Sequence, residues 1–401
     1  MVFPFSSIRD FAVEISEEHE IFRKSVRDFA EREIEPLVPE IERSNTIPTA
    51  LLKRAAELGY FGLGIPENYG GQGTDALAST IFVEEVSRVC PAFTVATLVH
   101  SLFTYPVLVY GTEEQRRKYI PPLARGEKHA SHATTEPGAG SDVAGIETTA
   151  KKHDGGWVIN GRKYFISGAD KADYFIVLAR TSPPPSRKER HKGLTFFIVE
   201  RGAEGLRVGE KIPVMGIRGS HPSEVILDNV YVPDENRVGE EGMGFKIAVD
   251  TYDHGRIGVA AQAVGVAQGC LEKTLRYALQ RKAFERPLIY FQAVQFHIAE
   301  MMTLIEAARV MVYWASSMMS KNREGAVMAA SMAKLFATEV AEKAALKAIT
   351  VHGGMGVAVD GLVERFLRDS QIFKVYEGAN DIQKLVILRQ LMKTAFGMDV
   401  E

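Results

Sequence analysis

The order in which hydrophobic periods change along these 401 residues restricts the fold more than any other feature. Apolar residues recur at helical spacing from Glu17 to about Glu127, with a turn-rich break at 66–71. Three β-rich runs follow, and the helical period returns after Gly242; the runs are 172–180, 194–200 and 223–233. This order predicts an α+β chain with three domains, which are an N-terminal α-helical domain (1–128), a middle β-sheet domain (129–240) and a C-terminal four-helix bundle (241–401).

Two local patterns refine this prediction. The segment 156–168 places Asn160-Gly161 between β-rich stretches, and this dipeptide is the strongest short-range signal for a two-residue β-hairpin. In the last third, one apolar stripe steps by three and four residues; its members are Ile298, Met301, Ile305, Ala308 and Val312. We therefore expect a hairpin turn at 160–161 and a long helix that buries one face in the bundle.

Charge and motif content exclude several classes of protein. The 48 basic and 51 acidic residues give a formal charge of −3, so no basic excess favours nucleic acid as a partner. The α-β-α order, without GxGxxG or GxxxxGK[ST], disfavours Rossmann and P-loop nucleotide sites. His297 and Glu300 are three residues apart but lack a second such pair, so we expect no metal site.

The N-terminus and the cysteines indicate the compartment. The first residues lack the basic flank of a secretory signal, and only Cys90 and Cys270 are present, which suggests a reducing environment with two inert, buried thiols. Residues 89–112 contain no charged side chain and are long enough to cross a bilayer, but His100, Pro106 and several hydroxyls favour a buried helix. We expect a cytoplasmic protein without a membrane span.

Two segments combine the residue types that ligand sites and acid–base sites use. At the predicted helix-to-strand junction, 134–142 (TTEPGAGSD) mixes hydroxyls with glycines, so its backbone can approach a flat, acceptor-rich ligand; an ordinary junction turn fits equally well. The segment 376–381 (YEGAND) offers a carboxylate whose protonated form an apolar pocket would favour, although most glutamates are solvated surface groups. Spacing alone leaves these alternatives open.

Taken together, the motifs of the chain resemble those of the acyl-CoA dehydrogenase family. They follow the family's order from about residue 17 to 392, and they are 135–142 (TEPGAGSD), 163–168 (KYFISG), 252–256 (YDHGR), 281–284 (RKAF), Gln292, 352–356 (HGGMG) and 376–383 (YEGANDIQ). The resemblance implies FAD bound between a β domain and two helical domains, a homotetramer, and an electron-transferring flavoprotein as electron acceptor. It also implies a place in fatty acid β-oxidation.

By this resemblance, Glu377 is the catalytic base. It removes the α proton of an acyl-CoA thioester while the β hydrogen leaves as hydride to flavin N5, which yields a trans-2-enoyl-CoA. Enolate charge develops on the thioester oxygen, and the family stabilises it with the base's own backbone N–H and a flavin ribityl hydroxyl. Some members carry their base at the place of Gly255, which cannot act here, so Glu377 is the only base on offer.

Matching positions assign the other site residues. Thr135, Ser167 and Phe165 match contacts to the flavin ring, whereas Asp253 and Arg256 match the helix that grips coenzyme A; for this pair a surface ion pair is the alternative. Positions expected at the cofactor are His132, Thr134, Thr135, Ser141, Phe165, Ile166, Ser167, Arg281, Phe284, Gln292, Thr350, Gly353, Gly354, Ala379 and Asp381, of which Arg281, Phe284 and Gln292 match residues that contact FAD of a neighbouring subunit. Positions expected at the substrate are Ser141, Tyr252, Asp253, Arg256, Leu98, Tyr376 and Gly378.

Several positions depart from the common family pattern. Phe165 stands where tryptophan is frequent and Glu285 where glycine is usual, and Thr350, Ala379 and Asp381 also differ. Asp381 brings a negative charge near phosphates, which weakens FAD binding unless a cation such as Arg281 offsets it. Phe93 stands where glutaryl-CoA dehydrogenases carry an arginine, so a dicarboxylic substrate is not expected; Phe93, Leu98 and His100 are expected near the floor of the acyl pocket.

Two alternatives to a dehydrogenase are other flavin enzymes with the same fold and a protein without catalytic activity. An acyl-CoA oxidase or a flavin monooxygenase shares the fold, but monooxygenases generally lack the glutamate and oxidases typically carry a C-terminal extension. A non-catalytic binding protein is the third reading, which a colourless protein unable to take up FAD would favour.

Overall fold

The computed structural model describes residues 13–399, in which six helices come first. Their bounds are α1 Glu17–Phe29, α2 Val38–Ser44, α3 Thr49–Glu57, α4 Ala76–Ser87, α5 Pro91–Tyr110 and α6 Glu113–Ala124. Side chains cap several of them: the Ser16 hydroxyl accepts from the His19 N–H at α1, and Thr112 forms a capping box with Gln115 at α6. The helical first third expected from the periodicity is confirmed.

The middle of the chain forms an eight-stranded sheet in the order β6-β7-β3-β2-β4-β5-β8, with β1 paired to β4. The strands are β1 Ala130–Ala133, β2 Thr149–His153, β3 Gly156–Ile166, β4 Tyr174–Arg180, β5 Leu194–Glu200, β6 Leu206–Lys211, β7 Ser223–Pro233 and β8 Arg237–Val238. Most neighbours are antiparallel, while β1 and β2 pair with β4 in parallel. All three β-rich runs predicted from the sequence are strands, and the sheet is not of the doubly wound Rossmann type.

The hairpin predicted at Asn160-Gly161 is wrong. Strand β3 runs straight through this dipeptide, and its register to β7 shifts between Ile159 and Gly161, which marks a β-bulge. The two-residue turn lies at Asp154-Gly155, where His153 pairs with Gly156 and both turn residues have positive φ (40° and 77°). An Asp-Gly turn carries the same left-handed preference as Asn-Gly, so the signal was present but was assigned to the wrong dipeptide.

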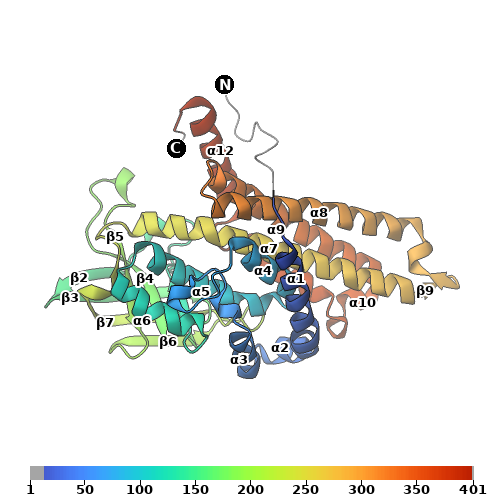
Figure 1. Cartoon of the computed structure of the whole chain (residues 1–401), viewed down its shortest axis with the longest axis horizontal. Helices are drawn as coiled ribbons and strands as arrows, with labels where there is room; N and C mark the ends of the chain where they lie inside the picture. The colour runs from blue at the N-terminus through green and yellow to red at the C-terminus, as the bar shows by residue number, and fades with distance from the viewer. Residues whose placement is uncertain (1–12, 400–401) are drawn as a thin grey trace.

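The last third is a bundle of long helices, which Figure 1 shows running side by side away from the sheet. The elements are α7 Gly244–Gln280, β9 Lys282–Ala283, β10 Arg286–Pro287, α8 Gln292–Ser320, α9 Ala326–His352, α10 Gly354–Val357, α11 Glu364–Phe373 and α12 Asn380–Phe396. Helix α7 has 37 residues and is therefore about 55 Å long; it packs against α9, α8, α4 and α5. The predicted stripe on α8 faces the core, because Met301, Ile305, Ala308 and Val312 are buried.

Helix α5 is the one helix in residues 13–399 that is long and apolar enough to cross a membrane by length and composition. In the fold, 56% of its apolar window is buried against other elements. It packs on α7, α4 and β1, so it connects the helical domain to both the sheet and the bundle. These contacts are those of a core helix in the folded chain.

Candidate active site

The loop between α11 and α12 presents Glu377. Its backbone turns through two consecutive left-handed residues, Glu377 with φ 53° and Gly378 with φ 90°. The glycine adopts this conformation without cost, whereas a side chain there is strained by about 1–2 kcal/mol. Two buried side chains, Lys334 Nζ and Gln383 Nε2, each donate to the Gly378 carbonyl oxygen at 2.8 Å. The loop is therefore held in a strained conformation by specific hydrogen bonds, as is common at functional sites.

The Glu377 carboxylate points at the first half of α7. A Cβ placed on Gly255 would lie 3.0 Å from Glu377 Oε2 and 3.2 Å from a methyl of Leu102 on α5, so α7, α5 and the loop meet at this point. Glu377 Oε2 is buried and has no hydrogen-bond partner within residues 13–399. Burial raises the pKa of Glu377 to about 7, although the charges of Arg256 and Lys334 oppose this shift. A buried carboxylate with a free oxygen and a pKa near neutrality is suited to accept a proton.

The pair Asp253 and Arg256 is buried beside Glu377, so the surface ion-pair alternative is wrong. The two side chains lie 2.5 Å apart, and Arg256 Nη1 donates to Ser331 Oγ on α9 at 3.1 Å. Burial raises the pKa of Asp253 to about 6 and lowers the pKa of Arg256. The Arg256 Nε has no hydrogen-bond partner in the described part of the chain. A second buried polar atom next to Glu377 thus lacks a partner in the protein alone.

A chain of polar side chains joins β1 to α7 on the other side of this point. His132 Nε2 lies 2.8 Å from Thr134 Oγ1 and 3.3 Å from the Tyr252 hydroxyl, while His132 Nδ1 lies 3.1 Å from the Leu102 carbonyl oxygen. Burial lowers the pKa of His132 to about 4, which keeps the ring neutral at pH 7. Burial and the nearby Glu377 raise the pKa of Tyr252, so its hydroxyl stays protonated. The structure therefore brings three predicted site residues, His132, Thr134 and Tyr252, together with Glu377.

The segment 134–142 follows β1 rather than a helix, which corrects its predicted place at a helix-to-strand junction. The Tyr164 N–H donates to the Thr135 carbonyl at 2.8 Å, and Ser131 Oγ donates to the Ser167 carbonyl at 2.8 Å. The predicted flavin contacts Thr135 and Ser167 thus lie on one patch formed by β1 and the end of β3. Below the patch, the buried Lys163 ammonium donates to Glu136 Oε1 at 2.7 Å and to the Thr134 carbonyl at 3.1 Å.

This patch has the features of a surface for a flat aromatic cofactor. Phe165 is 54% exposed and has φ 57°, so the end of β3 presents an aromatic ring instead of burying it, whereas Ile166 beside it is buried. A Cβ on Gly138 or Gly140 would meet no atom within 4 Å, so that stretch of backbone is open to a ligand. Ser141 is exposed at the end of this stretch, and Asp142 pairs with Arg190 at 2.8 Å. The open backbone, the exposed ring and the partnerless Oε2 fit a bound flavin and its substrate.

A second group of predicted cofactor residues lies at the far end of the bundle. At a rise of 1.5 Å per residue, Arg281 is about 39 Å from Gly255 along the axis of α7. Arg281 follows α7, Gln292 begins α8, and Phe284 at the tip of the β9–β10 turn is 90% exposed. Thr350, Gly353 and Gly354 are exposed at the end of α9, beside the last turns of α7, where His352 stacks on Tyr277. One chain therefore does not bring these residues to Glu377.

Ala379 and Asp381 lie at the start of α12, directly after the Glu377 loop. The Asp381 side chain is 89% exposed and pairs with Lys384 at 2.9 Å. Within one chain, the cation that pairs with Asp381 is therefore Lys384, while Arg281 lies at the other end of the bundle.

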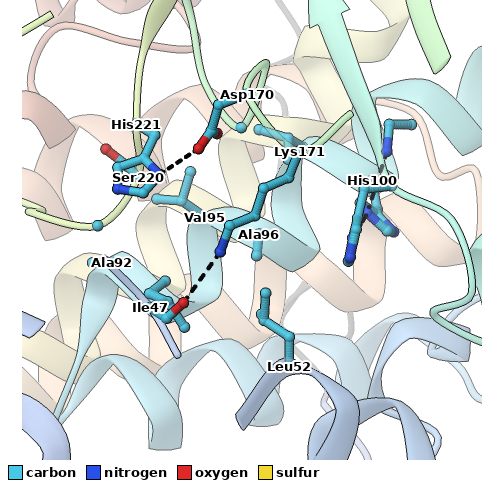
Figure 2. Close-up of a pocket in the computed structure, with 15 residues that line it drawn as sticks. Ile47, Leu52, Ala92, Val95, Ala96, His100, Asp170, Lys171, Ser220 and His221 are labelled. Atoms are coloured by element: carbon cyan, nitrogen blue, oxygen red, sulfur yellow. Dashed lines mark hydrogen bonds and ion pairs between the residues drawn. The ribbon is translucent and has the colours of Figure 1, made fainter. Parts of the chain in front are cut away.

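Leu98, Phe93 and His100 lie on α5 but do not form one wall. Leu98 packs on α7, since a Cβ at Gly258 would be 2.5 Å from its methyl, whereas Phe93 is buried against Phe29 of α1. His100 borders a separate cavity of about 40 Å³ between α5 and the sheet domain, which Figure 2 shows together with Lys171 and His221. Burial lowers the pKa of His100 to about 3, and its Nε2 lies 3.2 Å from His129 Nδ1. His100 is thus a core histidine.

Three contributors to the site were missed from the sequence: Leu102, Lys334 and Gln383. Lys334 had a signal, because it is the single charged residue between 326 and 338 in an alanine-rich helix. A lone cation in an otherwise uncharged stretch of a helix indicates a buried partner. Among residues 13–399, no three His, Cys, Asp or Glu side chains are grouped to hold a metal ion. Tyr376, a predicted substrate contact, donates its hydroxyl to Gln262 of α7.

Known protein families and relatives match this architecture along the chain. Three family models match the chain in order: the N-terminal (16–127), middle (131–230) and C-terminal (242–392) domains of acyl-CoA dehydrogenases. An acyl-CoA dehydrogenase of Bacillus subtilis is 42% identical over 379 residues, which cover 94% of this chain and 99% of the relative. CarC, a subunit of the caffeyl-CoA reductase-Etf complex of Acetobacterium woodii, is 41% identical with the same coverage.

The solved structure of butyryl-CoA dehydrogenase from Megasphaera elsdenii superposes with a TM-score of 0.90 at 36% identity, over 94% of this chain and 98% of that one. The fold, the order of the three domains and the relatives agree along almost the whole length. The chain therefore belongs to the acyl-CoA dehydrogenase family of FAD-dependent oxidoreductases.

Proposed function

We propose that this enzyme converts an acyl-CoA to the trans-2-enoyl-CoA, with Glu377 as the base that removes the α proton. The observation that carries the proposal is Glu377 Oε2, a buried oxygen with no hydrogen-bond partner in residues 13–399, on a carboxyl group whose pKa is about 7. At neutral pH such a group exists in both protonation states, so it can take up and release a proton. When bound, FAD supplies the acceptor for the β hydrogen and its two electrons.

The protein's own groups prepare the proton transfer. Arg256 and Lys334 favour the ionised form of Glu377 by their charge, while burial keeps its basicity high. The Glu377 backbone N–H makes no hydrogen bond within residues 13–399, so it is free to donate to the thioester oxygen. Negative charge that develops on that oxygen is stabilised where a fixed donor already points at it. His132, neutral because its pKa is about 4, adds no charge to the site.

We assign FAD and coenzyme A to different surfaces of the protein. We assign the flavin ring to the patch of Thr135, Phe165 and Ser167, and coenzyme A to Ser141 with the start of α7. The far-end residues Arg281, Phe284 and Gln292 lie too far from Glu377 to serve the same FAD, so we assign them to the cofactor of a second copy, as expected for a homotetramer. CarC is a subunit of a complex with Etf, which supports an electron-transferring flavoprotein as the redox partner here.

The relatives indicate which acyl groups to test first. A butyryl-CoA dehydrogenase and a subunit of a caffeyl-CoA reductase complex are among them, so butyryl-CoA and caffeyl-CoA are the first substrates to compare. Phe93 is uncharged and packs against Phe29 of α1, so it offers no cation for a second carboxylate. We place the reaction in fatty acid β-oxidation in the cytoplasm, with α5 as a core helix and not a membrane span. If aerobic turnover instead releases hydrogen peroxide, the enzyme is an acyl-CoA oxidase.

The test of Glu377 is its replacement by glutamine, which keeps the shape but cannot accept the proton. Glu377→Gln protein is expected to retain FAD and bind acyl-CoA, while flavin bleaching under anaerobic acyl-CoA slows by about 10³-fold. Glu57→Gln, an exposed glutamate on α3, is the control and is expected to bleach at the parental rate. Bleaching of Glu377→Gln at the parental rate would remove Glu377 from the mechanism.

A further inference from the structure

Lys334 is the charged residue that the proposed mechanism does not yet explain. Its side chain extends from the first third of α9 and is 0% exposed, and no other charged residue lies between 326 and 338. Burial of an ammonium group is costly unless it gains partners, and a methionine of similar shape would avoid that cost. Its position therefore requires an account beyond packing.

The hydrogen bonds of Lys334 go to the loop that carries Glu377 and to the residue that begins α12. Its Nζ donates to the Gly378 carbonyl at 2.8 Å and to Asn380 Oδ1 at 3.0 Å. Asn380 is held in turn, because its Nδ2 donates to Thr338 Oγ1 at 3.0 Å and its backbone N–H donates to the Lys374 carbonyl at 2.9 Å. One ammonium thus links helix α9 to the residue directly after Glu377 and to the first residue of α12.

Charge links the same two residues. Burial lowers the pKa of Lys334 to about 7, and the nearby Glu377 acts in the opposite direction. The other titratable groups around the Glu377 carboxylate are Arg256, Asp253 and Tyr252 from α7 and Tyr376 from its own loop. Arg256 is already paired with Asp253 at 2.5 Å, whereas Lys334 donates to neutral oxygens only. Its positive charge is therefore the one near Glu377 that no other carboxylate neutralises in the described contacts.

We propose that Lys334 is the positioning residue of the base: it fixes the left-handed turn at 377–378 through Gly378 and Asn380, and it supplies the counter-charge when the Glu377 carboxylate ionises. Gln383 also donates to the Gly378 carbonyl, at 2.8 Å, so that oxygen keeps one donor without the lysine. Loss of Lys334 therefore removes the charge and the Asn380 contact while leaving a partly held loop. The kinetic part of this inference rests on the proposed role of Glu377, and the loop-anchoring part does not.

The experiment compares Lys334→Met with Lys343→Met, the same change at an exposed lysine of the same helix. Amide hydrogen exchange of the holoenzyme, read on peptides covering 374–383, is expected to accelerate at least about tenfold in Lys334→Met and to stay unchanged in Lys343→Met. In rapid-reaction bleaching with butyryl-CoA, Lys334→Met is expected to be slower by about 10²-fold with FAD content retained. The pH midpoint of bleaching is expected to rise by about one unit, because the ionised carboxylate loses its counter-charge.

The outcomes separate the two levels of the inference. Unchanged exchange and an unchanged pH midpoint in Lys334→Met would overturn the positioning role, even if the rate falls. If Glu377→Gln proves fully active, the proposed base is wrong, yet the exchange result still decides whether Lys334 anchors the loop. Should Lys334→Met fail to fold, Asn380→Ala removes one of the two acceptors and is expected to accelerate exchange on 374–383 and lower the bleaching rate; parental values for both would reject the proposal.

Discussion

A glutamate with a left-handed backbone lies near each end of helix α7, one with a buried carboxylate oxygen and the other exposed. Near its start, Glu377 has a left-handed backbone with φ 53°, is followed by a glycine, and packs against Gly255. Beyond its end, Glu285 has a left-handed backbone with φ 68° at the tip of the β9–β10 turn, where it is exposed. Figure 1 shows β9 at the end of the bundle opposite the sheet.

The difference lies in what surrounds each glutamate. Around Glu377, buried charges and hydrogen bonds from α7, α9 and α12 fix the loop and perturb the pKa of the carboxyl group. Around Glu285, exposed side chains dominate: Phe284 is 90% exposed, and Arg286 lies over the Phe291 ring at 4.3 Å. The near end gathers buried charged groups of one chain around Glu377, and the far end is an exposed surface that we assign, as a proposal, to a second copy.

The largest effect that we expect to distinguish the two ends is a pH dependence of the bleaching rate, caused by Glu377 at the near end. A base must be ionised to accept a proton, and the pKa of Glu377 is about 7, so the bleaching rate should fall as pH drops below 7. Between pH 7 and pH 5 the ionised fraction of a group with a pKa of about 7 falls from about 0.5 to about 0.01, so the bleaching rate is expected to fall by about 50-fold. Stopped-flow bleaching at saturating acyl-CoA measures the midpoint for the complex.

A flat profile over that range would contradict a titrating base at the near end. The control is the FAD absorbance over the same pH range without substrate, which should stay constant. Substrate binding excludes further water from the carboxylate, so a midpoint slightly above 7 is consistent with the prediction, whereas a midpoint near 4.5 is not.

Sequence patterns predicted the three-part fold because long helices and buried strands have clear hydrophobic periods. They failed at Asn160-Gly161, where tertiary pairing of β3 with β7 turns a strong hairpin signal into a bulge. The neighbouring Asp154-Gly155 made the turn instead. A turn dipeptide shows only that the backbone can form a turn there; pairing with the partner strand determines whether the turn forms.

The candidate site was predictable only through resemblance. Nothing in the local sequence distinguishes Glu377 from the other acidic residues, because its property depends on burial against α7 and α5, which are remote in sequence. The same holds for the buried pairing of Asp253 with Arg256, whose three-residue spacing looks like a surface ion pair. Lys334 was detectable as the single charged residue between 326 and 338, but its partners Gly378 and Asn380 were not.

An intermediate effect is expected at the far end. Phe284→Ala removes the most exposed aromatic side chain of the turn, so we expect the affinity for FAD to fall by about tenfold together with weaker subunit association. FAD titration of the apoprotein and analytical ultracentrifugation measure the two quantities. Phe396→Ala, at an exposed phenylalanine at the end of α12, is the matched control.

The comparison breaks down if Phe284→Ala alters the near end as well. With FAD at saturation, its bleaching rate and pH midpoint should match those of the parent enzyme, because Glu377 and its partners lie in the other half of the bundle. A shifted midpoint at full FAD occupancy would show that the far end influences Glu377, either through one chain or through the cofactor that we assign to a second copy.

The smallest expected effect comes from the two left-handed glutamates themselves. Glu285→Gly relieves the strain of a side chain at φ 68° but adds freedom to the unfolded chain, so the free energy of unfolding should change by less than about 1 kcal/mol. Glu377→Gly relieves the same kind of strain at φ 53°, and it also deletes the carboxylate. Thermal unfolding of both variants, with bleaching measured in parallel, should therefore show similar small stability changes and loss of turnover only for Glu377→Gly. Equal loss of turnover in both would mean that the side chain at 285 is needed as much as the carboxylate at 377, and the contrast between the two glutamates would fail.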